Sequence, residues 1–308
     1  MIPQLKQALH HNTVKIIPGI VLGLFSAAAT GGSFIFSKVI QQEMPTPAFV
    51  TWWFGLAGIF GLVSYRYAVR RELSPPAQLC GHTWLLLLSI ALLNGIRGLT
   101  QHAAVLIGDP ALVSFLGRFT TVDVLLLSVL LLGERLNRQS IVGSALVITG
   151  ALLITYTSAS VNDAVILLMS AAALSEAADI VVAKAAGRTA PLPLMVAIRG
   201  LGTASFAALV MLTTGQWTLP SAGVLPVLVI GAAIGPFGGF FARYLGLRYI
   251  NAWTMGILIA TQPLFTVLYS AVFLGGAPDA PSLLGGLILV AGVILAITAS
   301  ASLASHEA

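Results

Sequence analysis

Residues 131–154 read LLGERLNRQSIVGSALVITGALLI, and residues 273–297 read FLGGAPDAPSLLGGLILVAGVILAI, so two similar segments lie far apart in the chain. Three glycines recur with an offset of 142: Gly133, Gly143 and Gly150 correspond to Gly275, Gly285 and Gly292. Glycines seven residues apart fall about 20° from alignment on a helix, where they form a stripe for close packing. The two segments therefore predict an internal repeat.

The repeat continues toward the N-terminus of each half with a slightly larger offset. Adding 146 takes Lys38 to Lys184, Pro45 to Pro191 and Pro47 to Pro193. The offset changes because the first half has the longer loop, at 69–82, between its second and third apolar runs. One difference in loop length therefore reconciles the two offsets across the whole chain.

Composition is typical of a membrane protein. Of 308 residues, 57% are hydrophobic and 8% are charged, whereas a soluble domain has about 25% charged residues. The single cysteine, Cys80, excludes an internal disulfide. A membrane helix needs about 20 apolar residues. Apolar runs of about this length fall near 16–38, 48–68, 84–106, 111–132, 140–157, 164–184, 191–213, 222–245, 252–274 and 282–300.

These runs predict an all-α integral membrane protein with ten transmembrane helices. When their ends are read alternately, eleven of the fifteen basic residues collect on one side. They are Lys6, Lys15, Arg66, Arg70, Arg71, Arg135, Arg138, Lys184, Arg188, Arg243 and Arg248. By the positive-inside rule that side is cytoplasmic, and so are both termini. The basic surplus therefore reports topology, and no nucleic-acid partner is expected.

An odd number of helices in each half makes the two halves insert with opposite orientation. We expect a cytoplasmic segment at 1–15, a first five-helix repeat at 16–157, a second at 158–300 and a cytoplasmic tail at 301–308. Inverted repeats are typical of secondary transporters, in which one half rocks against the other around a site at the membrane midplane. The expected location is the cell (inner) membrane, with multiple passes through the bilayer.

The repeated segments also resemble the EamA domain of the drug/metabolite transporter superfamily. Gln262-Pro263 resembles the Glu-Pro step of its penultimate helix, although Thr120-Thr121 stands there in the first copy and Gly275-Gly276 replaces Gly133-Glu134 in the second. The resemblance covers nearly the whole chain. It implies ten helices in two inverted repeats, a central substrate cavity and a transporter, with export the commoner direction. It leaves the substrate open.

Six charged residues are expected in the hydrophobic interior, away from the ends of the runs: Arg97, Arg118, Asp123, Glu176, Asp179 and Arg199. A charge at a helix centre costs about 2.5–3.5 kcal/mol on insertion scales, so these side chains should face the bundle interior or a wet cavity. Most of their repeat counterparts are uncharged: Thr30 and Ser33 for Glu176 and Asp179, and Gly239, Ala260 and Phe265 for Arg97, Arg118 and Asp123. A charge that the shared scaffold needs for stability should occur in both halves. Charges that occur in one half only therefore favour a functional site over a structural role.

Glu176, Asp179 and Asp123 are the predicted proton-coupling acids, with Arg199 as the charge partner of Glu176 and Asp179. A structural role for Arg199 is the alternative, because EamA domains commonly carry an arginine early in this helix. Three bases and three acids can also pair simply to fix helix register. The choice stays open at this point.

Arg97 and Arg118 supply two positive charges suited to a carboxylate or phosphate. Aromatic side chains at similar depth can pack the apolar part of a substrate; they are Trp53, Phe119, Tyr244 and Trp253. Together they predict a small amphipathic metabolite with an acidic group, such as an amino acid or an organic acid, carried by alternating access with proton coupling as a hypothesis.

Other functional classes find less support. No Gly-Lys dipeptide is present, so the chain has no phosphate-binding loop for ATP, and HExxH is absent. We expect no enzyme activity, no cofactor and no metal site. An intramembrane enzyme that uses the two carboxylates as acid and base, and an uncoupled channel or sensor, remain the alternatives.

Overall fold

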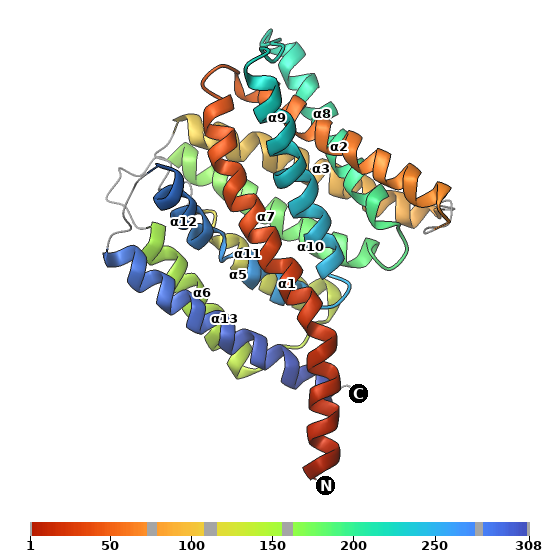
Figure 1. The fold of residues 1–308 in the computed structure, drawn as a ribbon, viewed down its shortest axis with the longest axis vertical. Helices are drawn as coiled ribbons and strands as arrows, with labels where there is room; N and C mark the ends of the chain where they lie inside the picture. The colour runs from red at the N-terminus through yellow and green to blue at the C-terminus, as the bar shows by residue number, and fades with distance from the viewer. Residues whose placement is uncertain (1, 73–78, 108–115, 156–162, 275–279, 307–308) are drawn as a thin grey trace.

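The computed structural model describes the chain except residues 1, 73–78, 108–115, 156–162, 275–279 and 307–308 (Figure 1). The first half contains α1 (Ile2–Ile40), α2 (Thr46–Arg70), α3 (Gly81–Ile107), α5 (Phe119–Leu132) and α6 (Arg138–Thr155). The second half contains α7 (Asp163–Ala186), α8 (Leu192–Thr213), α9 (Val224–Ala232), the π-helix η1 (Ala233–Gly239), α10 (Phe240–Gly246), α11 (Ala252–Ile259), α12 (Gln262–Leu274) and α13 (Ala280–His306). Across the described residues the chain forms helices and no strands.

Ten helical segments match the ten predicted membrane helices. Within the described residues, eight are long and apolar enough to cross a bilayer, with α9, η1 and α10 forming one continuous span and α11 with α12 another. Two shorter apolar helices, Phe119–Leu132 and Arg138–Leu153, complete the set. The prediction of an all-α membrane protein with ten helices is confirmed.

The two halves pack around an approximate two-fold axis. Equivalent helices contact each other, α2 against α8 and α6 against α13, and α6 and α13 run side by side in Figure 1. The packing of α3 on α7 is repeated by the packing of the α9–η1–α10 span on α1. Exchanging the halves therefore preserves the main helix contacts, as expected for two related five-helix units.

Glycines let the equivalent helices approach closely. A Cβ on Gly143 of α6 would lie 2.9 Å from the carbonyl oxygen of Gly292 on α13. A Cβ on Gly58 of α2 would lie 2.5 Å from the Leu201 amide nitrogen on α8. Both separations are too short for a side chain, so these contacts require glycine. The stripe predicted from the repeat therefore lies at an interface between the halves.

Arg118 and its counterpart in the second repeat, Ala260, both lie just before a helix begins. Arg118 precedes α5, and Ala260 lies between α11 and α12. The span that contains Pro236 is interrupted differently, by the π-helix η1. Proline lacks an amide hydrogen and its ring displaces the preceding turn, and π-helical turns often occur at functional sites. These irregular segments border the site described next.

Candidate functional site

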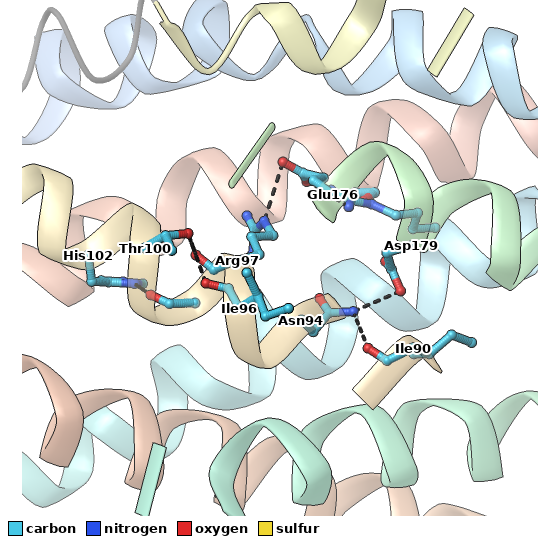
Figure 2. A network of polar contacts seen from close by, with 11 residues as sticks. Ile90, Asn94, Ile96, Arg97, Thr100, His102, Glu176 and Asp179 are labelled. Carbon is cyan, nitrogen blue, oxygen red and sulfur yellow. Dashed lines mark hydrogen bonds and ion pairs between the residues drawn. The ribbon is translucent and has the colours of Figure 1, made fainter. Parts of the chain in front are cut away.

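Glu176 on α7 lies between two arginines in the interior of the bundle. Its Oε1 accepts a hydrogen bond from Arg243 Nη1 at 2.9 Å. Its Oε2 is 3.3 Å from Arg97 Nε (Figure 2). The Arg97 contact is an ion pair that is not aligned as a hydrogen bond. The Arg243 side chain is 1% exposed. One carboxylate thus neutralises two guanidinium groups supplied by α3 and α10.

Asp179 lies one turn further along α7 and is fully buried. Its Oδ1 accepts hydrogen bonds from Asn94 Nδ2 at 2.7 Å and from the Tyr244 hydroxyl at 2.9 Å. Asn94 also donates to the Ile90 carbonyl oxygen at 2.9 Å (Figure 2). The other carboxylate oxygen, Oδ2, has no hydrogen-bond partner among the described residues. Asp179 is thus held by two uncharged donors.

Arg199 on α8 is fully buried and stacks on aromatic rings. Its Cζ is 3.2 Å from the centroid of the Phe240 ring and 5.2 Å from that of Phe54. None of its three nitrogens has a hydrogen-bond partner within the described part of the chain. Arg199 interacts electrostatically with Asp179 but forms no ion pair with it or with Glu176 among the described residues. The predicted charge partner of these acids therefore acts at a distance.

Arg243 was predicted to lie among the cytoplasmic basic residues, and this prediction is wrong. It lies only three residues before the end of α10, so counting along the chain places it near the membrane surface. Helical side chains lean toward the N-terminus of their helix, which for α10 is the middle of the bundle. Arg243 thus reaches Glu176 from a position close to the helix end. We name Arg97, Glu176, Asp179, Arg199 and Arg243 the charge cluster.

A cavity of about 50 Å³ lies beside the charge cluster. Its lining includes Arg97, Trp53, His102, Phe54 and Phe240. This volume holds a few water molecules and is far below the roughly 300 Å³ of a typical ligand pocket. The central cavity is therefore contracted in this conformation.

A larger pocket, of about 230 Å³, lies toward the side of the molecule that carries the described ends of α1 and α13. Three of its lining residues are basic, Lys184, Arg188 and Arg248, and we name it the basic pocket. Tyr244 lines this pocket and also donates a hydrogen bond to Asp179. Since Arg97 lines the central cavity, the charge cluster lies between two separate cavities.

The structure brings together some of the predicted site residues and not others. Arg97 and Trp53 line the central cavity, Tyr244 lines the basic pocket, and Arg118 interacts electrostatically with Glu176. Phe119 is 48% exposed and does not line either space.

The side chains of the two remaining predicted residues form no hydrogen bond or ion pair with the charge cluster among the described residues. Trp253 is fully buried in the hydrophobic core. Asp123 is partly buried, and no hydrogen bond or ion pair between it and the cluster is found in the described residues. The rotation of each helix about its own axis decides whether a side chain faces the cluster. The depth of a residue in the membrane does not reveal that rotation.

Sequence reasoning missed three residues of the site: Asn94, Phe240 and Arg243. Asn94 carried a usable signal, because it is a polar residue three positions before Arg97 inside an apolar run. Phe240 carried none, since aromatic residues are common in membrane helices. No group of three potential metal ligands occurs in the part of the chain that the structure describes.

The two repeats and this site can now be compared with known proteins. The EamA-like transporter family matches residues 17–156 and, a second time, residues 163–298. The chain belongs to the EamA-like transporter family. One curated relative, an "uncharacterized transporter in cobO 3′ region" of a Sinorhizobium species, is 31% identical over 131 residues. Those residues are 42% of this chain and 92% of the relative, whose whole length is thus close to that of one repeat.

A solved crystal structure supports the fold of this EamA transporter. It superposes with a TM-score of 0.75 over 93% of this chain and 98% of its own, at 19% sequence identity. Similarity at that identity speaks for the fold alone. The family assignment makes this chain a multi-pass membrane transporter, and its lipid bilayer and small-molecule substrate follow from that class.

Proposed function

We propose that this EamA transporter is a secondary active carrier of a small amphipathic organic anion, working by alternating access. The observation that supports the proposal best is the position of the charge cluster between two separate cavities. Arg97 lines the central cavity, Tyr244 lines the basic pocket, and both contact an acid of α7. A carrier needs such a barrier at its midplane site, because both cavities must never be open together.

The two sides of the barrier suit an anion. Lys184, Arg188 and Arg248 give the basic pocket a positive surface, which attracts anions from that side. In the central cavity Arg97 is the charged group nearest an incoming substrate carboxylate, with Trp53 and Phe54 available for its apolar part. Rocking of the halves would widen the contracted cavity while closing the pocket.

Asp179 is the better candidate for proton coupling, and Glu176 is the weaker one. Glu176 is fixed as a carboxylate by two arginines at 3.3 and 2.9 Å. Asp179 is held by Asn94 and Tyr244 through one oxygen only, and its Oδ2 is unpartnered. A proton can therefore sit on Oδ2 while both hydrogen bonds to Oδ1 remain. A buried acid of this kind is a typical element of proton relays in transporters.

The remaining parts of the proposal follow the positive-inside rule and the family. The side with the basic pocket is cytoplasmic, both termini lie on that side, and the membrane is the inner membrane of the cell. The functional units are the repeats at 16–157 and 158–300, although the boundary between them falls at 156–162, outside the described residues. Export is the proposed direction, so the basic pocket is where substrate enters.

Counterflow in proteoliposomes tests the carrier proposal. Vesicles loaded with unlabelled organic acids or amino acids should accumulate the labelled compound transiently, and an imposed pH gradient should change the rate. Chemical alteration of the compound would instead indicate an enzyme, and flux that does not saturate would indicate a channel.

The Asp179→Asn variant tests the coupling. Asparagine preserves an oxygen that accepts from Asn94 and Tyr244 but cannot exchange a proton. Counterflow should persist while the response to a pH gradient is lost. Glu176→Gln is the matched control on the same helix face, and it should keep the response to pH. An unchanged response in Asp179→Asn would reject coupling through Asp179.

A further inference from the structure

Three guanidinium groups surround one aromatic ring inside the bundle. The centroid of the Phe240 ring lies 3.2 Å from Arg199 Cζ, 4.2 Å from Arg243 Cζ and 5.8 Å from Arg97 Cζ. A ring face attracts cations, but one ring cannot neutralise three of them. Phe240 therefore shields cations whose charge is compensated mainly elsewhere.

Compensation in the charge cluster is incomplete. Its two carboxylates, Glu176 and Asp179, face three arginines, and Arg118 adds a fourth guanidinium that interacts with Glu176. Glu176 is shared between Arg97 and Arg243, and Asp179 is bound by uncharged donors. The charge cluster itself thus holds three guanidiniums and two carboxylates, one positive charge more than its acids compensate.

Arg199 is the arginine of the cluster whose positive charge is least compensated. It is fully buried, and each of its nitrogens lacks a hydrogen-bond partner among the described residues. Burying a charge without a partner is unfavourable even after relaxation, so such a group usually marks a function. An interior anion would supply the missing acceptors, because guanidinium binds carboxylate and phosphate oxygens through two parallel hydrogen bonds.

Phe240 stands between Arg199 and the central cavity. Both rings that Arg199 stacks on, Phe240 and Phe54, line that cavity, as does Arg97. Phe240 is the first residue after η1, the π-helix that contains Pro236. A π turn holds one residue more than an α turn, so its relaxation would rotate Phe240 by about 100° around the helix axis. Such a rotation would open the cavity toward Arg199.

We propose that the charge cluster is a binding site for an organic dianion, a dicarboxylate or a phosphate monoester, which Phe240 covers in this conformation. The inference rests on the proposed carrier function and specifies its substrate class. When Phe240 moves aside, Arg97 and Arg199 bind the two charged ends or the phosphate group of the ligand. A zwitterionic amino acid fits poorly, because its ammonium group would meet the guanidiniums of Arg97 and Arg199, and the carboxylate of Glu176 is already engaged.

Ligand binding to the purified full-length protein in detergent tests this site. The probes are succinate, glycerol phosphate, acetate and alanine at constant ionic strength, with the thermal unfolding midpoint recorded against concentration. We expect a dianion to bind roughly tenfold or more tightly than acetate or alanine. Succinate and glycerol phosphate distinguish the dicarboxylate from the phosphate form. Acetate or alanine binding as tightly as both dianions would overturn the proposal.

Two variants locate the site. Arg199→Gln should remove the preference for dianions, while Arg66→Gln, a matched change at an exposed arginine of α2, should retain it. Phe240→Leu removes the cover and its cation–π contacts, so dianion affinity should rise by about two- to tenfold. If Arg199→Gln does not fold, Phe240→Leu decides alone, and unchanged or weaker dianion affinity in it would overturn the proposal.

Counterflow separates this inference from the carrier proposal. A dianion that binds but shows no counterflow supports the site and contradicts the carrier. Counterflow of a neutral or zwitterionic compound, with no dianion binding, supports the carrier and overturns the site.

Discussion

Glu176 illustrates what a single ionisable residue does inside a membrane protein. Its carboxylate is 3.3 Å from Arg97 and 2.9 Å from Arg243, so three elements, α3, α7 and α10, meet at one side chain. The other half of the molecule has no such ion pair at the equivalent position. There the counterparts of Arg97 and Glu176 are Gly239 and Thr30, and a Cβ on Gly239 would lie 3.0 Å from Thr30 Cγ2. The same place in the fold thus holds an ion pair in one half and a small apolar contact in the other.

Removing one member of a buried pair should cost more than removing both. Arg243→Gln removes the hydrogen-bonded partner of Glu176, and loss of one partner of a buried ion pair typically destabilises a protein by about 3–5 kcal/mol. The double variant Arg243→Gln/Glu176→Gln should recover about 1–3 kcal/mol of that loss. Unfolding in detergent for the two single variants and the double variant measures this coupling, and strictly additive effects would contradict it.

At the scale of elements, glycine positions and helix interruptions determine how the halves fit. The α6–α13 pair is built from the repeated segments themselves, and its glycines stand backbone to backbone. The π-helix η1 occurs in the second half only among the described residues, at a proline whose first-half counterpart is Asn94. Asn94 instead donates to Asp179. The same position of the repeat therefore holds Pro236 within the π-helix in the second half and Asn94, a hydrogen-bond donor of the site, in the first half.

Gly150→Ala should destabilise the α6–α13 interface. A Cβ at Gly150 would overlap the backbone of Leu289 and Gly285, and backbone atoms cannot move aside as a flexible side chain can. Forcing a methyl group into a packed contact typically costs about 1–3 kcal/mol. Gly55→Ala on α2 is the control, because its Cβ would meet only the Ala204 Cβ at 3.6 Å. Equal unfolding midpoints for the two variants would show that the α6–α13 contact is looser than described.

At the scale of the whole molecule, two residues from different halves hold one loop of the second half. Glu134 accepts hydrogen bonds from the Ala252 N–H at 2.8 Å and the Trp253 N–H at 3.3 Å, at the start of α11. Lys184 Nζ donates to the carbonyl oxygens of Leu247 and Ile250, both at 2.6 Å. The segment 247–251 is therefore held at both ends, beside the basic pocket.

The Glu134 contact should give stability a measurable pH dependence. Burial raises the pKa of Glu134 above its ordinary value of 4.5, against the opposing effect of the Ala252 and Trp253 N–H groups and of Lys184. The folded state therefore holds this proton more tightly than the unfolded chain. The contribution of the group to stability is present below its unfolded pKa and is lost as pH rises through the folded pKa.

Glu134→Gln removes this titration. The unfolding midpoint of the natural protein relative to Glu134→Gln should therefore fall as the pH rises above the ordinary carboxyl pKa of 4.5. Midpoints recorded for both proteins below and above this pKa check the sign. A difference that stays constant with pH would show that Glu134 does not titrate differently in the two states.

The single cysteine offers a test of the proposed topology. Cys80 is exposed just before α3, and its hydrogen bond with Thr83 lowers the pKa of the thiol, which favours reaction with a maleimide. A membrane-impermeant maleimide should label Cys80 in inside-out vesicles and not in intact cells. Gln216→Cys in a Cys80→Ser background, exposed on the opposite side, should show the reverse. Labelling of Cys80 in intact cells would place the termini outside.

The sequence by itself determined the class, the ten helices, the repeat and the family of this protein. These properties depend on hydropathy and spacing along the chain, which are local quantities that can be read without knowing which helices touch. Sequence also identified Arg97, Glu176 and Asp179 as interior charges, because any charge in an apolar run needs a polar environment.

Only the tertiary structure decided which charges meet. Arg243 reaches Glu176 because its side chain leans back from a helix end, and Arg199 lies behind Phe240 without an ion pair to either acid among the described residues. Phe119 faces outward at a depth that also allowed it to face the cavity. The physical reason is that the azimuth of each helix, and its change across breaks such as η1, is set by contacts between helices distant in the chain. The depth of a residue in the membrane can be counted along the sequence, whereas the pairing of charged side chains depends on how the helices pack.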